Sequence, residues 1–339
     1  MSQEDFLPSI SAFRFCVAPM MGVTDRHFRF LARCLSQKAR LYTEMVPAQA
    51  LLHADPRRFL SFSLEERPLA LQIGGSDAKA LAHACRLAET YGFDEVNLNA
   101  GCPSKRVQAG EFGAVLMKTP KRLAFLARAM TEATTLPVTV KHRIGVDDIQ
   151  GYGFLRDLVG EMAASGVKVF IVHARAALLS LCTEKNRKIP PLCPDFVFRL
   201  KKDFPSQVFV LNGGLQNLQE ARSHLLQADG VMLGRAVRDD LKMLFGVDPL
   251  FYGARPPEDA FLRLARYIQE EARAGVCLVP LAKWLISLAK GMPGAKKLRA
   301  QLQTSARLGP LAMISALEML FFLKPFSSPE PLARQEALS

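Results

Sequence analysis

Short runs of β-branched and apolar residues alternate, up to about residue 250, with longer segments that carry apolar residues at helical spacing. The runs predict eight strands, at residues 15–18, 40–44, 69–73, 96–99, 138–141, 169–173, 208–212 and 230–234. The segments between them predict helices, among them residues 78–91, 120–134, 153–164 and 217–227. Strands that alternate with helices form parallel sheets, and eight repeats at this spacing favour an α/β fold of the (β/α)8 TIM-barrel type. An open doubly wound sheet is the alternative.

The pattern changes after the proline-rich segment at residues 255–257. Helical patterns follow with no strand between them, at residues 259–274, 278–290 and 312–323. We therefore expect a barrel domain over residues 1–250, a small C-terminal all-α helical domain over 256–325 and a flexible tail over 326–339. Between the second and third helical patterns, residues 291–299 are basic and contain glycine, which suits either a solvated surface or contact with phosphates.

Charge and cysteine content narrow the class of protein. Lysine and arginine number 44 against 32 aspartate and glutamate, a net charge of +12. Such an excess favours a polyanionic partner, with nucleic acid ahead of a merely basic surface. The seven cysteines form no C-x-x-C pair, which argues against a disulfide framework or a zinc site and for a reducing compartment. With no signal-peptide pattern and no uncharged run long enough to cross a bilayer, we expect a cytoplasmic protein without a metal or a membrane segment.

A cysteine lies directly after the fourth predicted strand. Gly101 ends the β-rich run, and Pro103 prevents a helix from starting before the chain has turned. Most free cysteines are small buried residues, and this is the ordinary explanation for Cys102. The flanking glycine and proline suit an exposed turn better than a packed core, and the residues around Cys102 are polar and positive. The pattern therefore favours a functional thiol.

The residues at the ends of the other predicted strands are unusually polar. In a barrel these ends share one rim, where the chemistry of such folds takes place. A single polar residue there could cap a strand or satisfy a buried backbone group. Their coincidence on one rim favours a ligand site, because burying so many polar groups without a ligand would be costly. The residues are Glu44, Gln72, Asn99, Lys141, Arg143, His173 and Arg175.

Glycines follow the seventh and eighth predicted strands, as Asn212-Gly213-Gly214 and Gly234-Arg235. Barrels often bind phosphate with the loops after these strands, where backbone N–H groups can approach an anion without obstruction. Arg235 adds a fork of donors. Turn formation is the ordinary role of a glycine pair, but the two sites together predict a phosphate site.

Several motifs then identify a family. The chain resembles the flavin-dependent tRNA-dihydrouridine synthases, most closely their A subfamily, from residue 18 to about residue 299. The motifs that carry the resemblance are Ala18-Pro19-Met20-x-Gly22-Val23-Thr24-Asp25, Leu71-Gln72-Ile73-Gly74-Gly75, Asn97-Leu98-Asn99-Ala100-Gly101-Cys102-Pro103-Ser104, Val140-Lys141-His142-Arg143-Ile144-Gly145, Val172-His173-Ala174-Arg175, the loop from Glu184 to Leu192, Asn212-Gly213-Gly214 and Gly234-Arg235.

The resemblance implies an FMN at the mouth of the barrel, NADPH as its reductant, and a tRNA uridine flipped over the flavin. It implies that the helical domain binds tRNA and that the modified uridines are those of the D-loop, around positions 20 and 20a. Cys102 corresponds to the proton donor of the family. Its FMN contacts correspond to Pro19, Met20, Met21, Gln72, Lys141, His173, Asn212, Gly213, Gly214, Gly234 and Arg235. Its uracil and tRNA contacts correspond to Asn99, Arg143, Asn186, Arg187, Lys296 and Arg299, with Lys141 and His173 also beside the uracil.

The implied reaction explains these residue types. Hydride from reduced flavin N5 can add to uracil C6 while negative charge accumulates on C5 and O4, and a proton must then reach C5. Cys102 can supply that proton only if it is still a protonated thiol when the hydride arrives. Lys141 and Arg143 could stabilise the enolate-like charge, or Lys141 could favour negative charge on the flavin after its reduction. The sequence leaves these two roles of Lys141 open.

Three alternatives compete with this hypothesis. An FMN barrel acting on a small pyrimidine or enone would keep the glycine motifs but has no use for a basic helical domain. A barrel that only binds RNA leaves Cys102 and the polar rim unexplained. Cys182 and Cys193 flank the loop from Glu184 to Leu192 and could compete with Cys102 as the reactive thiol. We expect the protein to act as a monomer.

Overall fold

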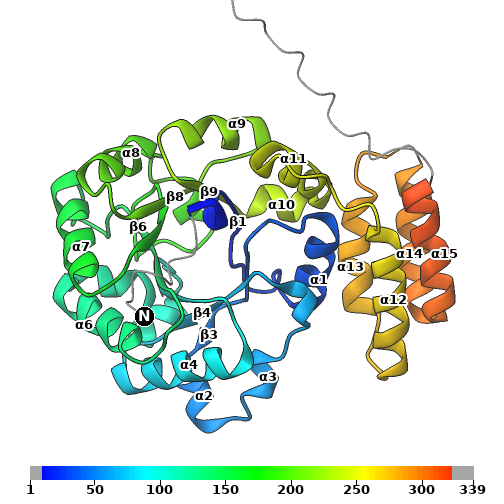
Figure 1. Ribbon diagram of the computed structural model, residues 1–339, viewed down its shortest axis with the longest axis horizontal. Helices are drawn as coiled ribbons and strands as arrows, with labels where there is room; N and C mark the ends of the chain where they lie inside the picture. The colour runs from blue at the N-terminus through cyan, green and yellow to red at the C-terminus, as the bar shows by residue number, and fades with distance from the viewer. Residues whose placement is uncertain (1–9, 293, 323–339) are drawn as a thin grey trace, which may run out of the picture.

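The computed structural model describes residues 10–292 and 294–322, and its larger part is a parallel barrel (Figure 1). The strands are β1 (Phe15–Val17), β2 (Leu41–Tyr42), β3 (Val46–Pro47), β4 (Leu69–Gly74), β5 (Glu95–Ala100), β6 (Val138–Arg143), β7 (Val169–His173), β8 (Val208–Asn212) and β9 (Gly230–Leu233). They pair in the order β1-β9-β8-β7-β6-β5-β4-β2, and the short β3 pairs only with β4.

The barrel closes between its first and second strands. Cys16 and Arg40 form a parallel bridge, in which Val17 N donates to Arg40 O and Arg40 N donates to Phe15 O, both at 2.9 Å. Each predicted strand falls on a strand of this wall, so the barrel prediction is confirmed and the open sheet is wrong. The carboxyl ends of the strands therefore meet at one rim.

Helices surround the barrel and continue into a separate helical unit (Figure 1). They are α1 (Arg26–Leu35), α2 (Ala50–His53), α3 (Arg57–Leu60), α4 (Ala78–Tyr91), α5 (Lys105–Ala109), α6 (Pro120–Thr131), α7 (Tyr152–Ala164), α8 (Pro194–Asp203), α9 (Leu218–Ser223), α10 (Arg235–Asp239), α11 (Val247–Tyr252), α12 (Ala260–Arg273), α13 (Val279–Leu288), α14 (Ala295–Leu308) and α15 (Pro310–Phe322). Short 3-10 turns are η2 (Ile10–Phe13), η3 (Leu64–Glu66), η4 (Gly113–Lys118), η5 (Lys185–Arg187), η6 (His224–Leu226) and η7 (Leu241–Gly246).

Capping residues set the starts of two barrel helices. The side chain of Asp77 accepts from Ala80 N at 2.7 Å and opens α4, which ends at Gly92 in the left-handed conformation. Asn217 accepts from Glu220 N at 2.8 Å and opens α9. Polar side chains at these positions satisfy backbone N–H groups that the first helical turn leaves without partners.

Strand residues divide between two faces, as the pleat requires. One face packs against the helices and forms the main hydrophobic core. The other face fills the barrel, where β7 and β8 contribute Val169, Ile171, Val208 and Val210. β4, β5 and β6 contribute polar inward residues as well, with Gln72, Asn97 and Thr139 all buried.

The helical unit lies beside α1 (Figure 1). The Trp284 Nε1–H donates to the Asp25 carboxylate at 3.2 Å, and Phe30 stacks on Tyr267 with 3.9 Å between ring centroids. Arg26 and Glu271 form an ion pair across the same interface. The β1–α1 segment of the barrel is thus held directly by α12 and α13.

Helix α14 was not expected from the sequence, which predicted three helices in this region. It begins inside the basic segment 291–299 and buries Leu298, Leu302 and Ser305 at helical spacing. The lysines and glycines at its start concealed that spacing. The expected tail 326–339, the last residues of the expected helical domain and Pro293 lie outside the described residues.

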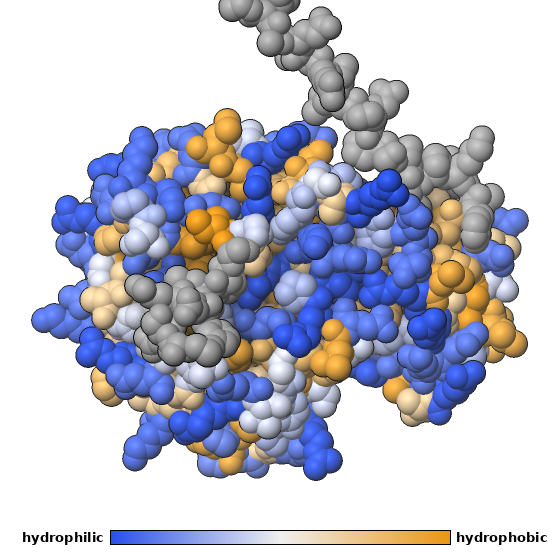
Figure 2. Space-filling model, in the orientation of Figure 1, coloured by the Kyte–Doolittle hydropathy of each residue, from blue (hydrophilic) through white to orange (hydrophobic). Residues whose placement is uncertain are grey.

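The surface is mostly hydrophilic over the barrel face shown in Figure 2, and apolar residues gather along the outer edge of the helical unit. Exposed apolar side chains of these helices include Leu262, Leu308 and Leu311. No helix in the described ranges is long and apolar enough to span a bilayer.

Candidate active site

A cavity of about 590 Å³ opens at the carboxyl ends of the barrel strands. The strand order brings together residues that lie far apart in the sequence, because every parallel strand ends at the same rim. Predicted site residues on its wall are Pro19, Met20, Met21, Gln72, Asn99, Cys102, Lys141, Arg143, His173, Arg187, Asn212, Gly213, Gly214, Gly234 and Arg235.

Five predicted residues do not line the cavity. Glu44 accepts from Gly22 N, and Arg175 Nη1 donates to Pro190 O. Asn186 is fully buried inside the β7–α8 loop, where its side chain accepts from Leu178 N and donates to Leu178 O, both at 2.7 Å. It therefore shapes this loop instead of facing the cavity. Lys296 and Arg299 are exposed on α14, where Arg299 Nε donates to Ala295 O at 3.1 Å.

Cys102 lies in the loop between β5 and α5, half-buried on the cavity wall. The side-chain oxygen of Asn99 accepts from Gly101 N at 3.2 Å and from Cys102 N at 2.5 Å. The Cys102 carbonyl accepts from Ala114 N at 2.9 Å. Gly113 allows this contact, because it has φ +71° and a Cβ there would lie 2.4 Å from Cys102 O.

The other cysteines differ from Cys102 in their surroundings. Cys16, Cys34 and Cys85 are buried, and burial raises the pKa of each thiol above its ordinary value. Cys182 is exposed and Cys193 half-buried, and neither lines the cavity. Among the cysteines of the described chain, the cavity wall therefore presents Cys102.

Lys141 reaches across the cavity floor from β6 to β8. Its Nζ donates to Asn212 Oδ1 at 3.0 Å, and Asn212 Nδ2 donates to Met232 O at 2.8 Å. No carboxylate of the described residues pairs with Lys141. Burial, together with the nearby Arg143, lowers the pKa of Lys141 to about 7.

Arg143 holds three backbone segments together. Its Nε donates to Gly101 O at 2.8 Å, and its Nη1 donates to Ala176 O at 2.9 Å and Asn186 O at 3.2 Å. Burial lowers its pKa to about 10, so it stays charged near neutral pH. Arg143 therefore joins the Cys102 loop to the loop that carries Arg187, and places a positive charge near the thiol.

Glycines form the opposite wall. Gly213 and Gly214 have φ of +109° and +80°, and a Cβ on Gly213 would lie 2.6 Å from His173 Cδ2. Burial, with Arg143 and Lys141 nearby, lowers the pKa of His173 well below its ordinary value, so the ring is neutral. Gly213, Gly214 and Arg235 all line this wall, and successive glycine N–H groups can bind an anion.

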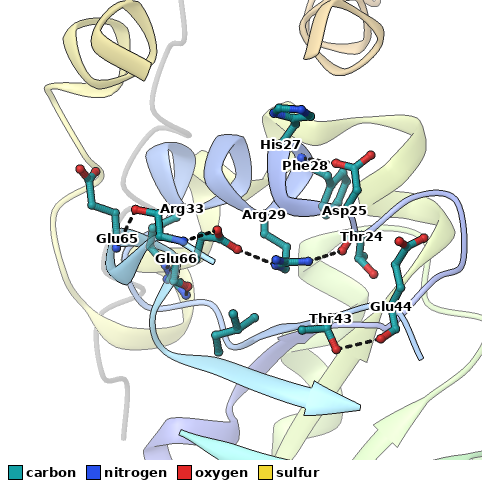
Figure 3. Close-up of polar contacts among 12 residues, drawn as sticks. Thr24, Asp25, His27, Phe28, Arg29, Arg33, Thr43, Glu44, Glu65 and Glu66 are labelled. Atoms are coloured by element: carbon teal, nitrogen blue, oxygen red, sulfur yellow. Dashed lines mark hydrogen bonds and ion pairs between the residues drawn. The ribbon is translucent and has the colours of Figure 1, made fainter. Parts of the chain in front are cut away.

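The loop after β1 carries Met20 and Met21. Its last residues are held at Thr24 by a buried ion pair (Figure 3). Arg29 Nε lies 2.6 Å from Glu66 Oε2, and Arg29 Nη1 donates to Thr24 O at 2.8 Å. Glu44 also accepts a short hydrogen bond from Gly22 N. The sequence analysis missed Arg29 and Glu66, because nothing in the spacing of a helix residue and a turn residue indicates that they pair.

Arginines surround the entrance to the cavity. Burial, Arg235 and Arg238 lower the pKa of Arg187, and burial and Arg235 do the same for Arg175. Arg238, which the sequence analysis did not select, also lines the cavity. In the sequence, Arg238 follows Arg235 by three residues, a spacing that places both arginines on one face of α10. These arginines at one entrance make a site that favours an anion. The described residues contain no cluster of side chains suited to a metal ion.

The family model described as Dihydrouridine synthase (Dus) matches residues 16–316. A tRNA-dihydrouridine(20/20a) synthase of Pseudomonas aeruginosa is 44% identical over 321 residues, covering 92% of this chain and 97% of that protein. Proteins of the same name from Salmonella typhimurium, 43% identical over 312 residues, and Synechocystis, 44% identical over 310 residues, cover 90% and 89% of this chain and 94% and 93% of their own.

Proposed function

The chain belongs to the dihydrouridine synthase family, and we propose that it reduces the C5=C6 bond of D-loop uridines in tRNA, at positions 20 and 20a, with FMN as cofactor and NADPH as reductant. The proposal is supported by the names of relatives that share most of the chain. It is also supported by a cavity that combines an anion-binding wall, a half-buried amine and an accessible thiol.

The residues of the cavity suit FMN. Its phosphate would lie against the backbone of Gly213 and Gly214 with Arg235, where a side chain in place of either glycine would collide with His173 or Leu192. Its ring system would be held by Gln72, Lys141 and the loop of Met20 and Met21. When bound, FMN supplies the hydride that adds to the pyrimidine. The half-buried amine of Lys141, which has no carboxylate partner among the described residues, supports such a group, because a poorly solvated charge without a counter-charge is costly.

Cys102 is the proposed proton donor to C5. The thiol lies on the cavity wall, and both neighbouring amides are fixed by Asn99. After donation, Arg143, which donates to the carbonyl of the preceding Gly101, stabilises the thiolate. Solvent then returns the proton to Cys102.

Lys141 acts mainly on the cofactor in this proposal. Its Nζ bonds to Asn212, the residue directly before the glycine wall, and so lies toward the proposed FMN side of the cavity. With a pKa of about 7 it can carry a positive charge when negative charge develops beside it. The neutral His173 can donate one hydrogen bond without adding charge.

A basic strip leads from the cavity entrance to the helical unit and supports tRNA as the substrate. Lys290 Nζ donates to Asp239 O at 3.0 Å, and Lys242 Nζ contacts Lys290 O, so these lysines join α10 to α13. Lys296, six residues after Lys290, is also exposed at the start of α14. A small pyrimidine would need no such surface, whereas a folded RNA makes many phosphate contacts.

The deciding experiment incubates the FMN-loaded protein with NADPH and a tRNA transcript, and then maps dihydrouridine by mass spectrometry. Reduction confined to positions 20 and 20a supports the proposal. Reduction of free uridine with none in tRNA would favour the small-substrate enzyme. Protein that stays colourless after incubation with FMN, yet binds tRNA, would favour the barrel that only binds RNA.

We further propose that the protein acts as a monomer in the cytoplasm. A tRNA substrate is available in that compartment. Sedimentation of the protein with tRNA would test the monomer, since a complex of two chains would contradict it.

A further inference from the structure

A continuous row of hydrogen-bonded side chains runs inside the barrel from Glu95, the first residue of β5, to the loop of Cys102. Thr139 Oγ1 donates to Glu95 Oε1, and Asn97 Nδ2 donates to Thr139 Oγ1 at 2.7 Å. Gln72 Nε2 donates to Asn97 Oδ1 at 2.7 Å, and Asn99 Nδ2 donates to Gln72 Oε1 at 2.9 Å. Asn99 then accepts from the amides of Gly101 and Cys102. All five side chains of this polar row (Gln72, Glu95, Asn97, Asn99 and Thr139) are buried.

The polar row has one direction. A carboxylate can only accept hydrogen bonds, and the Glu95 carboxylate forms an ion pair with Arg40. Tyr42 donates to the same carboxylate at 3.1 Å, and burial, with Glu95 nearby, raises the pKa of Tyr42 well above its ordinary value. Thr139 must therefore donate to Glu95 and accept from Asn97, and this fixes which way each amide faces.

The other end of the polar row demands the same direction. Two backbone N–H groups, of Gly101 and Cys102, point at Asn99, so its oxygen must face them and its nitrogen must face Gln72. Reversing the amides would set N–H groups against N–H groups in the Cys102 loop. The carboxylate at one end and the loop amides at the other thus specify one arrangement.

The location of the polar row argues against simple core filling. The inward residues of β7 and β8 in register with Thr139 are apolar, namely Val169 and Val208. Polar residues occur on β4, β5 and β6, and β5 is the strand that leads into the Cys102 loop. Apolar residues would fill the same space without requiring every partner to be satisfied.

We propose that Glu95, Thr139 and Asn97 are positioning residues that fix the Cys102 loop through Gln72 and Asn99, although none of the three lines the cavity. The consequence for turnover rests on the proposed function, because it assumes that Cys102 is the proton donor. The effect on the loop itself does not depend on the reaction.

Thr139→Val tests the proposal, because it keeps the shape of the side chain and leaves the pair of Glu95 and Arg40 in place. Asn97 then loses its acceptor, and the amides of the polar row are free to rotate. The readout is the rate at which iodoacetamide alkylates Cys102, followed by mass spectrometry. The exposed Cys182 and Cys277 in the same digest serve as internal standards.

The alkylation rate of Cys102 in Thr139→Val should rise about fivefold relative to those standards, the equivalent of ~1 kcal/mol for one hydrogen bond. Thr139→Ser restores the hydroxyl and should stay within about twofold of the original protein. An unchanged rate in Thr139→Val, or an equal rise in Thr139→Ser, would overturn the proposal. If Thr139→Val does not fold, Asn97→Ala breaks the polar row one residue nearer to Cys102 and should give the same rise.

A second readout separates this inference from the proposed function. Thr139→Val should slow dihydrouridine formation about fivefold while flavin reduction by NADPH keeps its rate, as expected when one hydrogen bond to the donor loop is lost. Equal loss of both rates would point to general damage and contradict the positioning role. If the original protein forms no dihydrouridine, the proposed function fails, and the alkylation rates still decide the inference.

Discussion

Replacing Lys141 with methionine should stabilise the FMN-free protein at neutral pH. In the folded chain the ammonium has Asn212 as its hydrogen-bond partner, and burial lowers its pKa from 10.5 to about 7. Lys141 therefore binds its proton more tightly in the unfolded chain than in the folded chain. At every pH at which the lysine of the unfolded chain is charged, this difference lowers the free energy of unfolding. Methionine has similar length and no charge, so it removes this penalty.

The size of the effect follows from the shift. The fall of the Lys141 pKa from 10.5 to about 7, at ~1.4 kcal/mol per tenfold change in proton affinity, gives an upper limit of ~5 kcal/mol. Loss of the hydrogen bond to Asn212 offsets ~1 kcal/mol, and contact of Lys141 with water in the cavity reduces the figure further. A net gain of roughly 1–3 kcal/mol at pH 7 is expected.

The sign of the pH dependence provides the control. The penalty is complete below pH 7 and disappears as pH rises to 10.5, so the advantage of Lys141→Met should shrink over that interval. Urea unfolding of the FMN-free proteins at pH 7, 8, 9 and 10 measures it. Lys168→Met, which removes an exposed lysine, should show no such trend. A variant that is less stable than the original protein at pH 7, or whose advantage is the same at pH 10, would refute the reasoning.

Further predictions concern acid stability, the cysteine loop and tRNA. Burial lowers the pKa of His142 from 6.5 to about 4. The free energy of unfolding should therefore fall by ~3 kcal/mol as the pH is lowered from 6.5 to 4, because the unfolded chain gains a proton that the folded chain does not. Urea unfolding of His142→Leu over the same pH range should not show this loss. Gly113→Ala directs a Cβ at the Cys102 carbonyl and should cost ~2 kcal/mol more than Gly253→Ala, which has a similar φ but open space; equal costs by urea unfolding would contradict this. Lys296→Ala should weaken tRNA binding and lower its salt slope by about one unit without changing NADPH oxidation, and an unchanged slope would remove α14 from the binding surface.

The strands of the barrel could be predicted because their β-branched runs are short, regular and separated by helical patterns. The site followed from the same regularity, since parallel strands deliver their last residues to one rim. The Cys102 loop was also visible, because Gly101 and Pro103 exclude both a strand and a helix there.

Other features depend on contacts that no local pattern carries. Arg29 pairs with Glu66 across 37 residues, and Glu95 stands at the start of a strand where it resembles any solvated residue. Asn186 was selected because its loop matches the tRNA-binding signature of the A subfamily, yet its amide is hydrogen-bonded within its own loop. Helix α14 was hidden by its lysine-rich first turn, where the buried spacing begins only at Leu298.

The most direct test of the account follows Cys102→Ala, with Cys277→Ala as the control for an exposed thiol outside the cavity. Each FMN-loaded variant is reduced with NADPH and mixed with tRNA, and dihydrouridine is measured over time. We expect Cys102→Ala to keep its flavin and its reduction by NADPH but to form dihydrouridine at least about a hundredfold more slowly, the usual loss on removing a general acid. Dihydrouridine formation at the original rate in that variant would contradict the assignment of the thiol as proton donor.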